Sequence, residues 1–104
     1  MRPQLPEIEV EVVLSPATSG ARSQKVLPDG YRPHLRVNGG EYLGVEFFGA
    51  SRRIDSKPTF RAKVRLVYWP QVDYEALSIG TTFEILEGPS VVGHGRVTKN
   101  THAI

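Results

Sequence analysis

The chain has 104 residues, and its 13 basic and 11 acidic side chains give a formal net charge of +2. This length predicts one domain with its own core. A net charge this small does not by itself indicate nucleic-acid binding. Because cysteine is absent, disulfides, thiol nucleophiles and thiolate metal sites are excluded, and no apolar run approaches the ~20 residues of a membrane span.

The absence of cysteine is compatible with a reducing compartment, and residues 1–6, with prolines at positions 3 and 6, lack the apolar core of a signal peptide. We therefore expect a cytoplasmic protein without membrane contact. The predicted organisation is a lead-in over residues 1–6, a β-barrel domain over residues 7–99 and a tail over residues 100–104, with fraying from Lys99.

Residues 7–14 are predicted to form the first strand, because apolar and acidic residues alternate there. One face would carry Ile8, Val10, Val12 and Leu14, and the opposite face would carry Glu7, Glu9 and Glu11. Ser15-Pro16 ends this strand. Residues 17–30 are rich in small and turn-forming types, which predicts a loop that closes in the turn Pro28-Asp29-Gly30.

Residues 30–37 are predicted to form a second strand with an irregular start. Its apolar face would carry Tyr31, Pro33, Leu35 and Val37, and its polar face Arg32, His34 and Arg36. Proline has no N–H for a ladder, so this end of the strand belongs at an edge, a strand start or a bulge. Asn38-Gly39-Gly40 then predicts a tight hairpin into a strand over residues 42–48.

The longest strand is predicted over residues 59–68, after a polar and basic loop over residues 50–58. Its outward face would carry Arg61, Lys63 and Arg65. One helical turn is expected within residues 72–77, followed by strands over residues 81–86 and 91–98 around a turn at residues 87–89. About six strands and no helix-length amphipathic segment predict an all-β barrel or sandwich.

Four segments, in the same order along the chain, resemble the third, C-terminal β-barrel domain of elongation factor Tu and related translation GTPases. They are Val13-Leu14-Ser15, then Ser19-Gly20-Ala21-Arg22 before Gly30-Tyr31-Arg32-Pro33, then Lys63-Val64-Arg65-Leu66-Val67 with Pro70, and Phe83-Glu84-Ile85-Leu86-Glu87-Gly88 leading to Val92-Gly93-His94-Gly95-Arg96-Val97. The resemblance covers residues 7–99 and implies a closed six-stranded Greek-key barrel.

The same resemblance implies partners and binding residues. In that family the third domain contacts the T stem of aminoacyl-tRNA, the exchange factor and its own GTPase domain. Arg22, His34 and Glu87-Gly88 match tRNA contacts, and closure of the barrel would bring them to one rim. The family's Thr-rich segment after the second strand is replaced here by residues 38–41, and Ser23 replaces a histidine. The distribution of basic side chains adds Arg32, Arg36, Arg52 and Arg53. The full predicted nucleic-acid-binding set is therefore Arg22, Arg32, His34, Arg36, Arg52, Arg53, Glu87 and Gly88.

The expected function is a non-catalytic, stand-alone binding module for structured RNA, such as tRNA, or for a translation-associated protein. The chain has no glycine-rich, phosphate-cradling loop, so neither GTP nor another cofactor is expected. The alternative, from a different class, is a protein-interaction module without nucleic-acid binding, such as a homodimer or a partner-blocking subunit. Ser, His and Asp are present without any triad or metal-ligand spacing, which predicts no catalytic or metal site.

Three features have competing interpretations. The cations at positions 61, 63 and 65 could bind phosphate, or they could pair with the glutamates of residues 7–14 if the two strands are neighbours, which we favour. His94, between two glycines, indicates a bulge or a close backbone approach rather than a ligand. Tyr68, Trp69 and Tyr74 are expected either in the core or at an interface.

Overall fold

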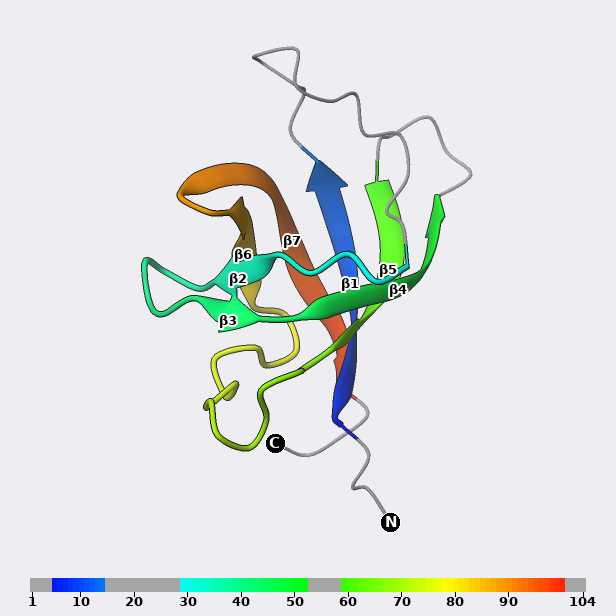
Figure 1. Ribbon diagram of the computed structural model, residues 1–104. Coiled ribbons are helices and arrows are strands. Elements are labelled where there is room, and N and C mark those ends of the chain that lie inside the picture. The colour runs from blue at the N-terminus through cyan, green and yellow to red at the C-terminus, as the bar shows by residue number, and fades with distance from the viewer. Residues whose placement is uncertain (1–4, 15–28, 53–58, 101–104) are drawn as a thin grey trace.

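The computed structural model describes residues 5–14, 29–52 and 59–100. Within these residues the secondary structure consists of seven β-strands and no helix, which confirms the all-β prediction (Figure 1). The strands are β1 (Glu7–Leu14), β2 (His34–Arg36), β3 (Leu43–Gly44), β4 (Glu46–Arg52), β5 (Thr59–Arg65), β6 (Thr82–Glu87) and β7 (Ser90–Asn100).

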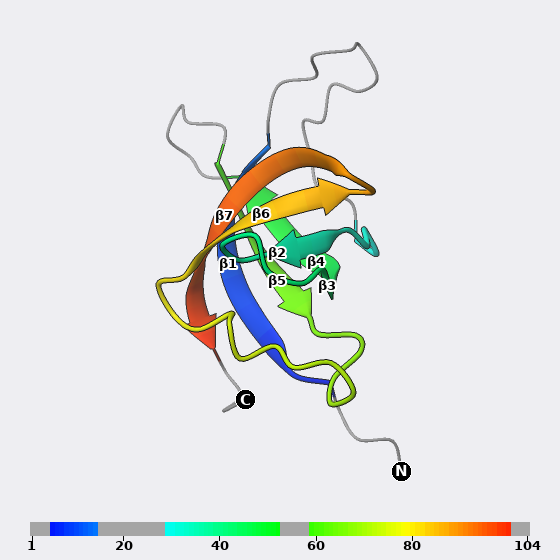
Figure 2. The ribbon, with the colours of Figure 1, turned by 90° about the vertical axis from the view of Figure 1, so that its left-hand side faces the viewer.

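The strands form one antiparallel sheet that curls into a half-barrel. Their order across the sheet is β3-β2-β6-β7-β1-β5-β4. The long strand β7 curves along the sheet and pairs with β6 on one side and with β1 on the other (Figure 2). Strand β1 is therefore flanked by β5 and β7.

The alternation of strand β1 confirms the prediction for residues 7–14, because the apolar residues Ile8, Val10 and Val12 are buried. Strand β5 is its neighbour, as the charge pattern favoured, and the aligned pairs are Glu7 with Arg65, Glu9 with Lys63 and Glu11 with Arg61. The core lies on the concave side of the curled sheet and also takes Leu35, Phe47, Phe60, Val64, Leu66, Tyr74, Ile85 and Val97.

The irregular start of the second strand is also confirmed. Pro33 precedes β2 and is buried, while its C=O accepts a hydrogen bond of 3.3 Å from the Val45 N–H. Tyr31 pairs with Phe47 through an isolated bridge. The hairpin turn follows as predicted, with φ of 52° at Asn38 and 70° at Gly39, the positive values that an Asn-Gly turn adopts.

Several predicted boundaries are wrong. The strand predicted over residues 30–37 is regular only over His34–Arg36. The strand predicted over residues 42–48 is divided at Val45 into β3 and β4, and β4 continues to Arg52, where the sequence predicts a loop. Strand β5 ends at Arg65 rather than at residue 68. Residues 72–77 form turns instead of a helical turn, with the Leu77 N–H bonded to the Tyr74 C=O at 2.9 Å. Strand β7 continues through Lys99 and Asn100, which do not fray because Asn100 still has Ile8 of β1 as its ladder partner.

The glycines around His94 make the close approach that the sequence indicated. A Cβ at Gly95 would lie 2.6 Å from the Phe83 ring and 2.7 Å from the Glu11 backbone oxygen, and one at Gly93 would lie 2.7 Å from the Val13 oxygen. Real Cβ atoms do not come so close, so only glycine lets β7 lie against β1 and the Phe83 ring at these positions.

The aromatic residues after β5 separate into core and surface. Tyr74 is fully buried, and its hydroxyl donates to the Gly44 C=O at 2.6 Å and accepts from the Tyr68 N–H at 3.1 Å. Trp69 packs partly buried against the core, whereas Tyr68 is 55% exposed. Of the adjacent phenylalanines, Phe47 is buried, and the half-buried Phe48 ring lies 4.2 Å from the Arg65 guanidinium carbon.

Candidate functional site

The outer face of strands β5, β1 and β7 collects charged side chains from three parts of the chain. Glu9 and Glu11 lie in the middle, on β1. Strand β5 places Lys63 and Arg61 opposite them on one side, and β7 places Lys99 and Arg96 opposite them on the other. Each carboxylate therefore lies between two cations. We call this set the β1 patch: Glu9, Glu11, Arg61, Lys63, Arg96 and Lys99.

The β1 patch has a net positive charge, because four cations surround two carboxylates, which leaves +2. Glu11 approaches the Arg61 Nε at 3.9 Å and an Arg96 Nη at 3.8 Å. These ion pairs are too long for hydrogen bonds, and the two arginine side chains are 69% and 59% exposed. Such exposed pairs are weak, so the guanidinium groups can donate to a partner.

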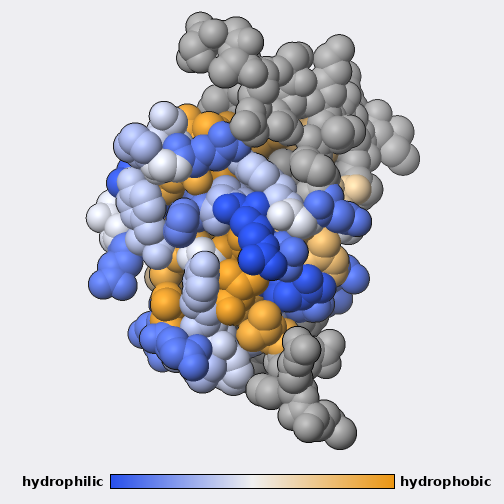
Figure 3. Space-filling model, in the orientation of Figure 1, coloured by the Kyte–Doolittle hydropathy of each residue, from blue (hydrophilic) through white to orange (hydrophobic). Residues whose placement is uncertain are grey.

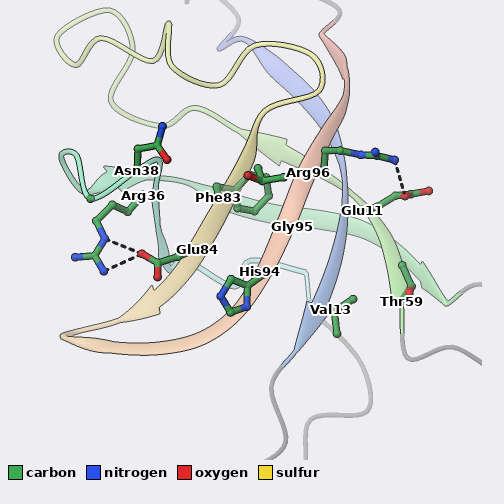
Figure 4. A pocket seen from close by; sticks show the side chains of 12 residues that line it. Glu11, Val13, Arg36, Asn38, Thr59, Phe83, Glu84, His94, Gly95 and Arg96 are labelled. Atoms are coloured by element: carbon green, nitrogen blue, oxygen red, sulfur yellow. Dashed lines mark hydrogen bonds and ion pairs between the residues drawn. The ribbon is translucent and has the colours of Figure 1, made fainter.

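Two hollows adjoin at Glu11. The smaller has a volume of about 340 Å³ and lies over the β1 patch itself, where Thr98 and Gly49 complete its lining. The larger, which we call the groove, has a volume of about 750 Å³ and lies over β6, β7 and β1, with the turn after β2 as one wall (Figure 4). Its polar lining consists of Glu11, Arg36, Asn38, Thr59, Thr82, Glu84, His94 and Arg96.

One row of the sheet crosses the groove from strand to strand. Arg36 is opposite Glu84, Glu84 is opposite His94, and His94 is opposite the exposed Val13. The Arg36 guanidinium binds one oxygen of Glu84 through Nε at 2.9 Å and Nη2 at 2.8 Å. Figure 4 shows this pair beside the exposed His94 of β7. The groove is thus nearly neutral in charge, and its wall combines this polar row with the apolar Val13 and Phe83.

Part of the predicted rim is brought together. The Tyr31 hydroxyl donates to Glu87 at 2.5 Å, so the start of the second strand lies beside the β6–β7 turn. Gly88, with φ of 58°, forms this turn together with Pro89. Arg32, which follows Tyr31 in the chain, is exposed, and its Nε lies 3.6 Å from Oε2 of Glu46.

The other predicted site residues are more scattered. His34 and Arg36 lie on β2 opposite Leu86 and Glu84 of β6. Arg52 lies in β4 opposite Phe60 of β5. Arg22 and Arg53 lie outside the described residues, as does the loop over residues 20–23, so the predicted convergence is seen only between Tyr31 and the β6–β7 turn.

Arg96 and Lys99 were missed by sequence reasoning. The alternation of residues 91–98 places Arg96 on the outward face, but it does not reveal that β7 lies beside β1. Lys99 falls in the stretch that the sequence predicts to fray. Pairing of β1 with β5 alone would have neutralised the outer face, and the second row of cations from β7 restores its positive charge.

Comparisons with known proteins do not assign the chain: no family model matches it, and no curated protein is significantly similar to it. Among the described residues, no three His, Asp or Glu side chains come together as a group that could hold a metal ion. The described residues also include no helix of the length and apolarity needed to cross a bilayer.

Proposed function

We propose that this chain is a non-catalytic, cytoplasmic module that binds structured RNA, such as tRNA, through the phosphate backbone. The observation that carries the proposal is the β1 patch, where Arg61, Lys63, Arg96 and Lys99 outnumber the two central carboxylates. Arginine and lysine contacts to phosphate supply most of the affinity of non-specific binding to nucleic acids and fix the orientation of the partner. No GTP, metal or catalytic group takes part.

We also propose that the fold is the closed six-stranded Greek-key barrel of the elongation factor Tu third domain. Only Val45 separates β3 from β4, the two ends of the sheet order. The same stretch pairs with the second strand, through the Phe47 N–H to the Tyr31 C=O at 2.8 Å and the Val45 N–H to the Pro33 C=O. These bonds support closure, and the contact between Tyr31 and Glu87 fits the rim that the resemblance implies.

Binding of a fluorescently labelled RNA stem-loop, measured by anisotropy over a series of salt concentrations, tests the RNA proposal. The affinity should fall steeply as salt rises. Arg96→Ala and Lys99→Ala should each weaken binding and lower the slope of log K against log salt by about 0.7–0.9, the value for one lost phosphate contact. No binding by the wild-type protein at low salt would refute the proposal.

Arg32→Ala is the matched comparison for this experiment, since Arg32 is as exposed as Arg61 but lies outside the β1 patch. If phosphate binds at the β1 patch, Arg32→Ala should leave the affinity and the salt slope nearly unchanged. If Arg32→Ala weakens binding more than Arg96→Ala does, the rim predicted from the sequence is the RNA-binding surface instead.

A second candidate is a protein-interaction module, either a homodimer or a subunit for a translation-associated protein. The observation that favours it is the connection between β5 and β6, where Tyr68 and Ile79 are 55% and 65% exposed. In Figure 3, hydrophobic residues reach the surface in the lower half of the view, beneath a band of hydrophilic ones. A dimer by light scattering that Ile79→Asp dissociates, with no RNA affinity, would favour this candidate over the first.

A further inference from the structure

We propose that the groove and the hairpin beside it bind unpaired nucleotides that adjoin the RNA helix, with one base stacked on Tyr42. This inference rests on the proposed function and adds a second site with a different chemistry. Tyr42 lies between the turn at Asn38-Gly39 and strand β3, and it is 43% exposed. Single-stranded RNA is recognised by stacking of its bases on such aromatic side chains.

The Tyr42 ring is held in place before any ligand binds. The Arg36 guanidinium carbon lies 5.6 Å from the centre of the ring, and the His34 ring lies at 5.6 Å with a tilt of 50°. Arg36 is fixed in turn by its two contacts to Glu84. A partner that stacks on the exposed part of this ring therefore loses little conformational entropy from the protein side.

The groove next to this ring offers polar groups to the edges of bases. Asn38 and Thr82 can each donate and accept hydrogen bonds, and the His94 imidazole adds two ring nitrogens to the lining. A volume of about 750 Å³ lies within the range of ligand-binding clefts and is sufficient for a nucleotide. Sequence-specific recognition of unpaired bases uses hydrogen bonds of this kind together with stacking.

The groove and the β1 patch form one continuous surface, because Glu11 and Arg96 contribute to both. If the phosphates of an RNA helix contact the β1 patch, the unpaired nucleotides that adjoin the helix would lie in the groove. The groove itself pairs Arg36 with Glu84 and Arg96 with Glu11, so it adds little net charge. Binding there should depend on stacking and hydrogen bonds, and its contribution should change little with salt.

The test compares labelled RNAs in anisotropy titrations: a blunt-ended duplex without a loop, and the same duplex with a short single-stranded extension at the 5′ or at the 3′ end. The wild-type protein should bind one of the extended RNAs about tenfold more tightly than the blunt RNA, the gain expected from one stacked base. Tyr42→Ala should abolish this gain and leave the affinity for the blunt RNA unchanged. Tyr42→Phe should keep the gain.

Two controls separate a binding role of Tyr42 from a structural one. Tyr68→Ala removes the other strongly exposed tyrosine and should keep the full gain. Tyr42→Leu keeps an apolar side chain at the hairpin, so it should melt like the wild type and still lose most of the gain. Equal affinity for all RNAs, or an equal loss for blunt and extended RNA in Tyr42→Ala, would overturn the inference.

These outcomes also distinguish the inference from the proposed function. If the extension gives no gain while Arg96→Ala still weakens binding of the blunt RNA, the phosphate-binding function stands and the stacking site is wrong. If no RNA binds at low salt, the proposed function fails and the stacking site fails with it. A gain that disappears at high salt would show an additional phosphate contact rather than stacking, and it too would overturn the inference.

Discussion

The two sides of the curled sheet differ in what holds them together. On the side of β5, β1 and β7, long strands form extended ladders of backbone hydrogen bonds, interrupted by one register shift between β1 and β7 at Glu9/Val10. On the side of β2 and β3, the strands have three and two residues. There, side chains supply hydrogen bonds: the Tyr31 hydroxyl to Glu87, Arg36 to Glu84 and the Tyr74 hydroxyl to the Gly44 backbone.

This difference separates structural polar groups from those available to a partner. Where the ladder is long, outward side chains such as Arg61 and Arg96 make long, exposed ion pairs with Glu11, which contribute little to stability. Where the ladder is short, a polar side chain that replaces it contributes to stability, and losing it leaves a partner unsatisfied. We therefore expect substitutions of these hydrogen-bonded side chains on the short-strand side to lower stability, and those on the β1 patch to change binding.

The largest expected effect on stability is that of Tyr74→Phe. The substitution keeps the ring but leaves the Gly44 C=O and the Tyr68 N–H without the hydroxyl that bonds both. The free energy of unfolding should fall by about 1–3 kcal/mol in urea titrations. Tyr68→Phe is the control and should be nearly neutral, since that side chain is mostly exposed. Equal effects of the two variants would contradict the structural role of the buried hydroxyl.

The pH dependence of stability should also report on Tyr74. Burial raises the pKa of Tyr74, and the hydrogen bond from the Tyr68 N–H opposes this only in part. The folded protein then keeps its proton at a pH where the unfolded chain, with a pKa of about 10, begins to lose it. This stabilisation is complete below that pH and is lost as pH rises toward the folded pKa. Tyr74→Phe should show a shallower alkaline loss in chemical denaturation, and an unchanged slope would exclude this cause.

Tyr31→Phe should have a smaller effect, because its hydroxyl is only part-buried. It removes the hydrogen bond to Glu87 and keeps the ring, whose centre lies 5.8 Å from that of Phe47. We expect a loss of about 1 kcal/mol in the free energy of unfolding. Glu87→Gln tests the same bond from the other side. If both variants unfold like the wild type, the side chains do not hold the β6–β7 turn to the second strand.

The smallest effect on stability is expected for Glu11→Gln on the β1 patch. Its effect on RNA binding should be opposite in sign to those of Arg96→Ala and Lys99→Ala. Since its ion pairs to Arg61 and Arg96 are long and both arginine side chains are exposed, the change in stability should stay within about 0.5 kcal/mol. RNA affinity at low salt should increase, because one of the two carboxylates that offset the cations is gone. Glu75→Gln, an exposed glutamate in the connection between β5 and β6, is the control. Weaker RNA binding in Glu11→Gln would count against phosphate binding at this patch.

Several strands and turns of the sheet could be predicted from the sequence. The alternation of Ile8, Val10 and Val12 with glutamates fixes both the extent of β1 and its buried face. The opposite charges of β1 and β5 correctly favoured their pairing. The turns at Asn38-Gly39 and at Gly88 follow from residues that adopt positive φ. These features are local, or depend on a simple match between two strands, and their signals are present in a few neighbouring residues.

The tertiary structure decided what those signals could not. Whether the outer face of β1 is neutral depends on its second neighbour, and β7 is separated from β1 by most of the chain. The same pairing extends β7 through Lys99, a residue that local patterns assign to a loose end. Likewise, nothing near Tyr74 in the sequence distinguishes it from the exposed Tyr68, because its hydroxyl is satisfied by Gly44, 30 residues away. Burial and net charge at a surface arise from distant segments brought together, so the sequence determined the strands and the fold determined the site.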